Sequence, residues 1–251
     1  MNKVGLLGKN ISYSYSKIIH EYIIKKYNLD YEYEIIDTDY LQDYIELLKK
    51  GEYVGFNITI PYKEKVLGYI DFLEGDAVEI KAINAIYRDE DEIYGVNTDC
   101  LGFTEMIKRN NTVVDKRNIY ILGSGGAAKA IYHCLKDYKP TIVSRNNDSK
   151  EFKRLINYSN IRCKKNDLII NTTPPNAYDD IISIVGKFGS NCELIDINYN
   201  PSPTKLMNHF NKSIDGFQML VFQAVQAARI LYNLEDINLD EIDIIEIRKL
   251  I

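Results

Sequence analysis

The segment around residue 123 constrains the fold more than any other part of the chain. The apolar run 119–122 leads directly into Gly123-Ser-Gly-Gly-Ala-Ala, and an alanine-rich stretch follows. A strand, a G-x-G-x-x-A turn and a helix start are typical of dinucleotide-binding folds. Gly123 permits the tight turn, Gly125 lets the backbone approach a pyrophosphate, and Ala128 lets the helix pack closely on the strand. The sequence therefore predicts a dinucleotide site.

The chain before this turn is long enough to form a domain of its own. Strand and helix signals alternate along it, ending in a hairpin whose tip, 89–92, is acidic. Pro61 fits the first position of a helix. The expected strands are 4–7, 31–36, 53–60, 85–87 and 93–96, and the expected helices are 17–27 and 41–50.

A second alternation follows the turn and indicates a parallel sheet with helices on both faces. Its expected strands are 119–122, 141–144, 168–171 and 193–197. After Gly216 the pattern is helical only, over 219–234 and 239–250, and we expect these helices to return to the first domain. The sequence therefore predicts an α/β fold of two domains: 1–98 with 217–251, and a Rossmann-like domain of 99–216.

Charge and hydropathy exclude several classes of protein. The formal net charge of −5 argues against a broad nucleic-acid surface, which needs a basic stripe. No run approaches the ~18 to 20 apolar residues of a membrane span, and the first apolar run is too short for a signal peptide. We therefore expect a cytoplasmic protein that binds neither nucleic acid nor a membrane.

Cysteine and histidine are too scattered for a metal centre. The 4 cysteines include no C-x-x-C pair, so ordinary thiols explain them better than a zinc site or a disulfide framework. We expect no metal. His20 and His133 fall within predicted helices, where packing or surface roles are usual. An enzyme built on this chain needs other residues for proton chemistry.

The strand after the glycine turn indicates which dinucleotide binds. NAD-binding folds usually carry Asp or Glu about 20 residues past the glycines, to hold the ribose 2′-hydroxyl. Here the strand ends in Ser144-Arg145-Asn146, with a guanidinium in place of a carboxylate. Arginine can pair with a 2′-phosphate, so the sequence favours NADP. The alternative is a solvated arginine in a turn.

Polar motifs in the first domain are candidates for the proton transfer that accompanies hydride transfer. Alternation puts Asn57 and Thr59 on one strand face, and Lys63 follows at the strand-to-helix corner. Asp99 ends the motif Gly95-Val-Asn-Thr-Asp99; facing Lys63 across a cleft, it would hold and tune the ammonium, and the pair could act as acid and base. The alternatives are a solvated lysine and a helix N-cap.

The third motif is Ser12-Tyr-Ser14-Tyr-Ser16, in the loop after the first strand. Alternate serines place two hydroxyls on the same side, where they can grip a carboxylate. The alternative is a turn with a serine cap for the helix that starts near Lys17.

In this order the motifs resemble the shikimate dehydrogenase family along nearly the whole chain. Each is weak alone, but eight in order are specific. They are Ser14-x-Ser16, Asn57-x-Thr59-x-Pro61-x-Lys63, Ile83-Asn84, Gly95-x-Asn97-Thr98-Asp99, the 123–128 turn, Asn171-Thr-Thr-Pro, Asp196-x-x-Tyr199-Asn200-Pro201 and Asp215-Gly216-x-x-Met219-Leu220-Val221-x-Gln223-Ala.

The resemblance implies reversible, NADPH-linked reduction of 3-dehydroshikimate to shikimate, on the pathway to chorismate and aromatic amino acids. It implies that 1–98 with 217–251 bind the substrate, that 99–216 bind NADP, and that Lys63 and Asp99 are the catalytic pair. The implied substrate-binding residues are Ser14 and Ser16 for the carboxylate, with Asn57, Thr59, Asn84, Tyr199 and Gln223. The implied cofactor residues are Gly123, Ser124, Gly125, Gly126, Ala127, Ser144, Arg145 and Asn146, with Ile197 and Gly216 on the nicotinamide side.

Two rival functions stay open. Quinate-using members often have threonine for one of the two serines; both are serine here, which favours shikimate but leaves dual use of quinate, or of NAD, open. A non-catalytic dinucleotide sensor is the rival of another class, and the presence of both Lys63 and Asp99 argues against it. The sequence leaves the oligomeric state open, with a homodimer as one alternative.

Overall fold

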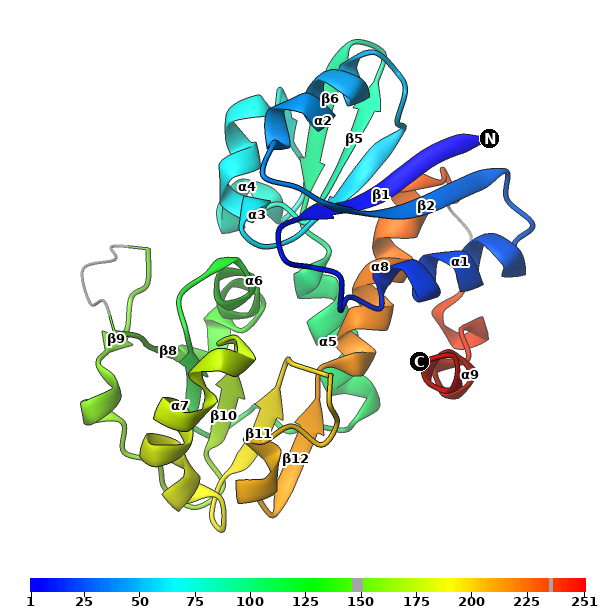
Figure 1. The fold of residues 1–251 in the computed structure, drawn as a ribbon. Coiled ribbons are helices and arrows are strands. Elements are labelled where there is room, and N and C mark those ends of the chain that lie inside the picture. Colours follow the sequence, from blue (N-terminus) through cyan, green and yellow to red (C-terminus); the bar gives the residue numbers. More distant parts are fainter. Residues whose placement is uncertain (146–150, 235–236) are drawn as a thin grey trace. The chain divides into compact units, whose positions relative to one another are not determined.

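The computed structural model describes residues 1–145, 151–234 and 237–251. The chain forms two compact units, Met1–Phe103 with Leu220–Ile251 and Thr104–Met219. The chain passes between the units within two helices, α5 (Asp99–Arg109) and α8 (Phe217–Leu231), both labelled in Figure 1. Among the described residues, each helix is too short or too polar to span a bilayer.

The first unit contains a mixed sheet in the order β2-β1-β3-β5-β6-β4. β1 pairs in parallel with β2 and β3, whereas β5 and β6 form the antiparallel hairpin expected around the acidic tip. The strands are β1 (Asn2–Gly8), β2 (Tyr31–Asp37), β3 (Gly55–Ile58), β4 (Phe72–Leu73), β5 (Ala85–Asp89) and β6 (Glu92–Val96). The helices are α1 (Ser16–Lys26), α2 (Leu41–Lys49), α3 (Tyr62–Lys65), α4 (Ala77–Ile80) and α9 (Ile244–Lys249), besides the parts of α5 and α8 within this unit.

Alternation along the strands and helical spacing on α2 bury one continuous apolar cluster in this unit. Phe56 and Ile58 on β3 point to the opposite face from their polar neighbour Asn57, and both are buried. Ile45 and Leu48 on α2 pack into the same cluster and are fully buried. This packing fixes the register of β3, and so the direction in which Asn57 and the following corner point.

The second unit contains an entirely parallel sheet in the order β12-β11-β10-β7-β8-β9. Its strands are β7 (Ile119–Leu122), β8 (Thr141–Val143), β9 (Leu155–Ile156), β10 (Leu168–Asn171), β11 (Glu193–Asp196) and β12 (Lys212–Asp215). α6 (Gly126–Cys134) and α7 (Tyr178–Val185) are its complete helices of eight or more residues among those described.

The two-domain α/β prediction is confirmed, with a mixed sheet followed by a parallel, Rossmann-like sheet. The return of the C-terminal helices is confirmed too, because α9 contacts α1 and most of α8 belongs to the first unit. Three short strands were not predicted: β4, β9 and β12. Each is only two to four residues long and at an edge of its sheet, so hydrophobic alternation has little length in which to show.

Two helix predictions were wrong in detail. Pro61 is not the first residue of a helix but precedes α3: it has φ −95° and ψ 22°, within a turn in which the N–H of Tyr62 donates to the carbonyl of Thr59 at 2.8 Å. The predicted helix 239–250 is a short 3₁₀ turn (Leu239–Glu241) followed by α9. The Asp243 carboxylate accepts the N–H of Glu246 at 2.9 Å, so it begins a new helix in mid-segment.

Candidate active site

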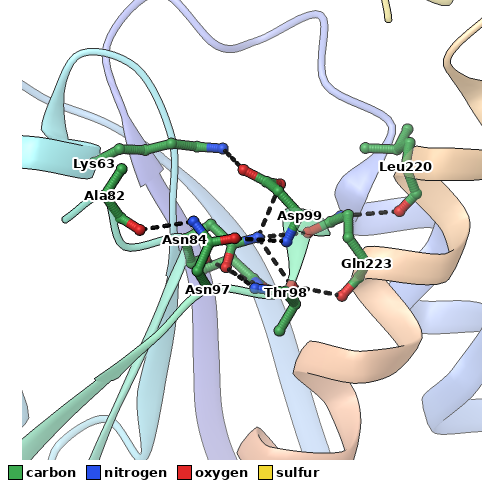
Figure 2. A network of polar contacts seen from close by, with 9 residues as sticks. Lys63, Ala82, Asn84, Asn97, Thr98, Asp99, Leu220 and Gln223 are labelled. Atoms are coloured by element: carbon green, nitrogen blue, oxygen red, sulfur yellow. Dashed lines mark hydrogen bonds and ion pairs between the residues drawn. The ribbon is translucent and has the colours of Figure 1, made fainter. Parts of the chain in front are cut away.

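An ion pair between Lys63 and Asp99 lies at the centre of the candidate site in the first unit. Lys63 Nζ is 2.5 Å from Asp99 Oδ2, and the two side chains face each other in Figure 2. The side chains are only 16% and 7% exposed. Because little water screens them, they interact more strongly than a surface pair does. The lysine is therefore not a solvated surface charge.

The backbone on both sides of the pair is fixed by strands. The N–H of Ile83 donates to the carbonyl of Lys63 at 2.7 Å, which ties α3 to the start of β5. Asp99 is the first residue of α5, directly after β6, and its N–H donates to Asn97 Oδ1 at 3.0 Å. Asn97 Nδ2 donates to the carbonyl of Ala82 at 2.6 Å. Asn97 thus accepts the first N–H of α5 while the Asp99 carboxylate faces the lysine, so one segment makes both contacts.

Asn84 joins the ion pair to helix α8. Its Nδ2 group lies 3.0 Å from Asp99 Oδ1, 2.9 Å from Thr98 Oγ1 and 3.2 Å from Gln223 Oε1, and its two hydrogens are shared among these three acceptors (Figure 2). Its Oδ1 accepts the N–H of Thr98 at 2.7 Å. With its amide oriented in this way, Asn84 holds Asp99 so that the other carboxylate oxygen points at Lys63. Hydrogen bonds through Asn84 thereby join Asp99 and Gln223, which are far apart in the sequence, into one polar cluster.

Gln223 and Thr98 complete that cluster. Gln223 Nε2 donates to the carbonyl of Leu220 at 2.9 Å, and Thr98 Oγ1 donates to the carbonyl of Gln223 at 3.0 Å. An amide nitrogen has two hydrogens, so this contact leaves Gln223 one N–H for a ligand. Lys63 likewise has further N–H donors beyond the one directed at Asp99. The cluster therefore suits a ligand that is rich in oxygen acceptors.

Asn57 and Thr59 occupy the β3 end of the same unit. Asn57 is buried; its Oδ1 accepts the Tyr33 hydroxyl at 2.9 Å and its Nδ2 lies 3.4 Å from the carbonyl of Asn84. Thr59 lies just past the strand, beside Gly8, where an added Cβ would come within 2.6 Å of its methyl group. Because the Thr59 side chain packs directly against the backbone of residue 8, that residue must be glycine.

The serine pair lies in the loop between β1 and α1. Ser14 Oγ donates to Ser16 Oγ at 3.0 Å and accepts the N–H of Ser16 at 3.2 Å. Ser14 therefore also accepts the N–H of the first residue of α1, while the two hydroxyls stay side by side. Asp37, at the end of β2, fixes the loop because its two carboxylate oxygens accept the N–H groups of Asn10 and Ile11.

The glycine turn in the second unit leaves room for a ligand. Gly123 has φ +106°, and an added Cβ would lie 2.6 Å from Thr172 Oγ1, so the fold itself requires glycine there. Gly125, before α6, has an ordinary φ of −82° and nothing within 4 Å of an added Cβ. Among the described residues, no neighbouring atom explains this second glycine. The open space at the N-terminus of α6 fits a bound phosphate.

The other predicted cofactor residues follow the ends of β7, β8, β11 and β12 or begin α6. Ser124 Oγ lies 3.1 Å from Ser144 Oγ, which joins the glycine turn to the end of β8, and Arg145 next to it is exposed. Gly216 and Ile197 are adjacent, because an added Cβ at Gly216 would overlap the carbonyl oxygen of Ile197. Gly126 and Ala127 begin α6. Asn146 lies outside the described residues.

Tyr199 is the one predicted substrate-binding residue that belongs to the second unit. It follows β11, in a segment organised by the fully buried Asp196. The carboxylate of Asp196 accepts bonds from Asn171 at 2.9 Å, Tyr178 at 2.8 Å and Thr204 at 2.7 Å. The sequence motif contained Asp196 but gave no sign of this role, because its partners come from separate elements.

The sequence patterns gave no sign of a role for Tyr33. Its side chain, on the predicted strand 31–36, is 2% exposed. What the pattern could not supply is the partner of its hydroxyl, since Asn57 lies two strands away in the sheet.

Comparison with known proteins relates these features to one family. Residues 6–86 match the model of the shikimate dehydrogenase substrate binding domain. A shikimate dehydrogenase (NADP(+)) from Clostridium botulinum is 37% identical over 245 residues, covering 90% of this chain and 95% of that protein. The crystal structure of shikimate dehydrogenase 1 from Peptoclostridium difficile has a TM-score of 0.88 and 31% identity, covering 100% of this chain and 97% of that one.

A further similar structure contains a ligand. The shikimate 5-dehydrogenase of Thermus thermophilus, solved in complex with shikimate, has a TM-score of 0.78 and 25% identity. The alignment covers 93% of each chain.

Proposed function

The chain belongs to the shikimate dehydrogenase family, and on that basis we propose that it catalyses the reversible NADPH-linked reduction of 3-dehydroshikimate to shikimate. The observation that carries the proposal is the shielded Lys63–Asp99 pair, 2.5 Å apart and braced by Asn84. A dehydrogenase acting on a secondary alcohol needs a group that takes up or supplies the proton of the reacting oxygen. This pair is suited to that role.

NADP⁺, when bound, accepts the hydride that leaves the carbinol carbon as shikimate is oxidised. Lys63 contacts the reacting oxygen and, from its neutral amine form, takes up the hydroxyl proton to become the ammonium, so that the C–O single bond becomes a carbonyl. In the reverse direction an N–H of Lys63 returns the proton to that oxygen. Asp99 holds the lysine amine in place and balances the positive charge that Lys63 carries once it is protonated. Every atom of the net change, one hydride and one proton, is thereby assigned.

The rest of the first unit orients the substrate. We assign its carboxylate to the paired hydroxyls of Ser14 and Ser16. Hydrogen-bond donors for the ring hydroxyls come from Asn57, Gln223 and Thr59. Asn84 contacts the ring of the substrate and also holds Asp99. We add Tyr199 of the second unit to this set on the family resemblance. A polyhydroxylated ring acid matches a cluster in which donors predominate.

The second unit is the proposed NADP domain. Gly123 to Ala127 hold the pyrophosphate at the N-terminus of α6, and Ser144, Arg145 and Asn146 hold the adenosine end. The exposed guanidinium of Arg145 pairs with the 2′-phosphate, which NAD lacks. Ile197 and Gly216 line the nicotinamide side. The absence of a carboxylate at the end of β8 among the described residues supports NADP over NAD.

We also propose that the enzyme works in the cytoplasm. All four cysteines are free thiols, as is usual for proteins of a reducing compartment.

Substituting the two glycines tests the cofactor site. In Gly125→Ala the added methyl group occupies the space assigned to phosphate, so the Kd for NADP⁺ should rise at least about tenfold. The melting temperature should stay close to wild type, because the backbone there is unstrained. Gly123→Ala is the matched control and should instead destabilise the fold by about 1–3 kcal/mol. Titration calorimetry measures the affinity for NADP⁺ and thermal unfolding measures the stability of each variant. An unchanged affinity in Gly125→Ala would remove this turn from the cofactor site.

One assay separates the proposed function from its rivals. Purified protein is given shikimate or quinate, each with NADP⁺ or NAD⁺, and reduced cofactor is followed by absorbance. We expect kcat/KM to be highest for shikimate with NADP⁺, and the preference for NADP⁺ to fall in Arg145→Ala. A higher value with quinate supports the quinate enzyme, and no turnover with any pair supports the sensor and contradicts the proposal.

A further inference from the structure

The buried side of the sheet behind Asn57 contains a second set of polar contacts. Tyr33 and Asn57 are 2% and 4% exposed, and the Tyr33 hydroxyl donates to Asn57 Oδ1 at 2.9 Å. Val4 pairs with Tyr33 on one side and with Gly55 on the other. Asn57 is two residues beyond Gly55, so it shares a sheet face with Tyr33. The bond therefore spans β1.

His20 on α1 holds the Tyr33 ring. The two rings are stacked, with centroids 4.1 Å apart and planes 6° from parallel. His20 is fully buried and its Nδ1 lies 2.7 Å from the Tyr232 hydroxyl. Burial lowers the pKa of His20 to about 3, so the ring packs as a neutral group at physiological pH. Burial likewise raises the pKa of Tyr33 well above its ordinary value, so its hydroxyl keeps the proton that it donates.

These contacts determine which way round the Asn57 amide lies. The carbonyl of Asn84 can only accept, and it lies 3.4 Å from the amide nitrogen. The Tyr33 hydroxyl meets the amide oxygen. The protein thus uses the oxygen and one N–H of Asn57. Among the described residues, the second N–H has no partner, and it is the group that Asn57 can offer to a ligand.

We propose that Tyr33 is a positioning residue that, held by His20, orients Asn57 as a hydrogen-bond donor to a ring hydroxyl oxygen of the substrate. The inference rests on the proposed function, because it takes Asn57 as a substrate contact. Without the tyrosine hydroxyl the amide oxygen loses its donor, and only the 3.4 Å contact with the Asn84 carbonyl opposes rotation of the amide to present its oxygen to the ligand. The bound hydroxyl then faces an acceptor in place of a donor.

The test compares Tyr33→Phe with Tyr53→Phe. Tyr53 also donates its hydroxyl within this unit, to Glu34, but it packs against Phe56, which points to the opposite face of β3 from Asn57. In Tyr33→Phe the KM for shikimate should rise about three- to tenfold, the effect of one neutral hydrogen bond. The kcat and the KM for NADP⁺ should stay within about twofold of wild type. Tyr53→Phe should leave all three unchanged.

A double-mutant cycle shows whether Tyr33 acts through Asn57. In an Asn57→Ala background, Tyr33→Phe should change the KM for shikimate by less than about 1.5-fold. The same rise in both backgrounds would overturn the inference, as would an unchanged KM in Tyr33→Phe.

A ligand-free measurement keeps the inference separate from the proposed function. The side-chain amide signals of Asn57, assigned by their absence in Asn57→Ala, should shift in Tyr33→Phe and stay in place in Tyr53→Phe. Unmoved signals in Tyr33→Phe overturn the inference whatever the activity. If the wild type fails to oxidise shikimate while the signals shift, the proposed function fails and the orienting contact stands.

Discussion

Lys63→Ala is expected to lower kcat for shikimate oxidation by at least about 100-fold, the lower range for loss of a positioned acid–base group. The KM for shikimate should change much less, because the serine and amide groups that we propose as substrate contacts remain. Asp99 keeps its bond from Asn84 at 3.0 Å in the variant, so the carboxylate is not left without a donor.

The neighbouring lysine supplies the control for this result. Lys65 lies two residues further along α3, is exposed, and has its ammonium over the ring of Tyr62. Lys65→Ala should keep wild-type kcat, and thermal unfolding should show both variants folded. A Lys63→Ala enzyme with near-normal kcat would remove the lysine from catalysis while leaving the fold and the cofactor site unaffected.

Acidification from pH 7 to 5 is expected to destabilise the wild type by about 2 kcal/mol through His20 alone. The pKa of this histidine is about 3 in the folded protein and about 6.5 when unfolded, so the unfolded chain binds the extra proton between these values. Stability from this group is therefore complete above about pH 6.5 and falls as the pH decreases towards 3. The buried groups that contact the ring are Tyr33 and Tyr232, and neither can compensate a positive charge.

His20→Phe separates this contribution from that of the carboxylates. The variant keeps a flat ring against Tyr33 but cannot titrate. Leaving the Tyr232 hydroxyl unpaired lowers its stability by an amount that does not change over this pH range. Urea unfolding at several pH values should show the variant gaining about 2 kcal/mol of stability relative to the wild type from pH 7 to 5. If the unfolding free energies of the two proteins change equally with pH, His20 does not contribute to the pH dependence and the prediction is wrong.

Local patterns in the sequence predicted the parts of the site that depend on one segment. The 123–128 turn lies between β7 and α6, as the strand-glycine-helix pattern indicates, because glycine conformation and helix starts are local properties. The motif Asn97-Thr98-Asp99 was predicted as a helix cap, as the position of a catalytic carboxylate, or as both at once. The segment combines a cap with a carboxylate facing the lysine, because each uses a different side chain.

Contacts between distant elements could not be predicted in this way. The contact between His20 and Tyr232 joins residues 212 positions apart, and the hydrophobic periodicity of either predicted helix gives no sign of it. β12 at the sheet edge has the sequence Lys-Ser-Ile-Asp, which is too short and polar to show a strand pattern. Asp243 restarts a helix inside a stretch with continuous helical spacing, because a side-chain cap overrides propensity.

A crystal structure with shikimate and NADPH, a pair that cannot react together, tests the central claim most directly. We predict that the reacting hydroxyl oxygen lies about 2.6–3.2 Å from Lys63 Nζ, with the carboxylate on the hydroxyls of Ser14 and Ser16. A substrate whose carboxylate pairs with Lys63, or whose ring hydroxyls lie beyond reach of the Lys63–Asp99 pair, would contradict it.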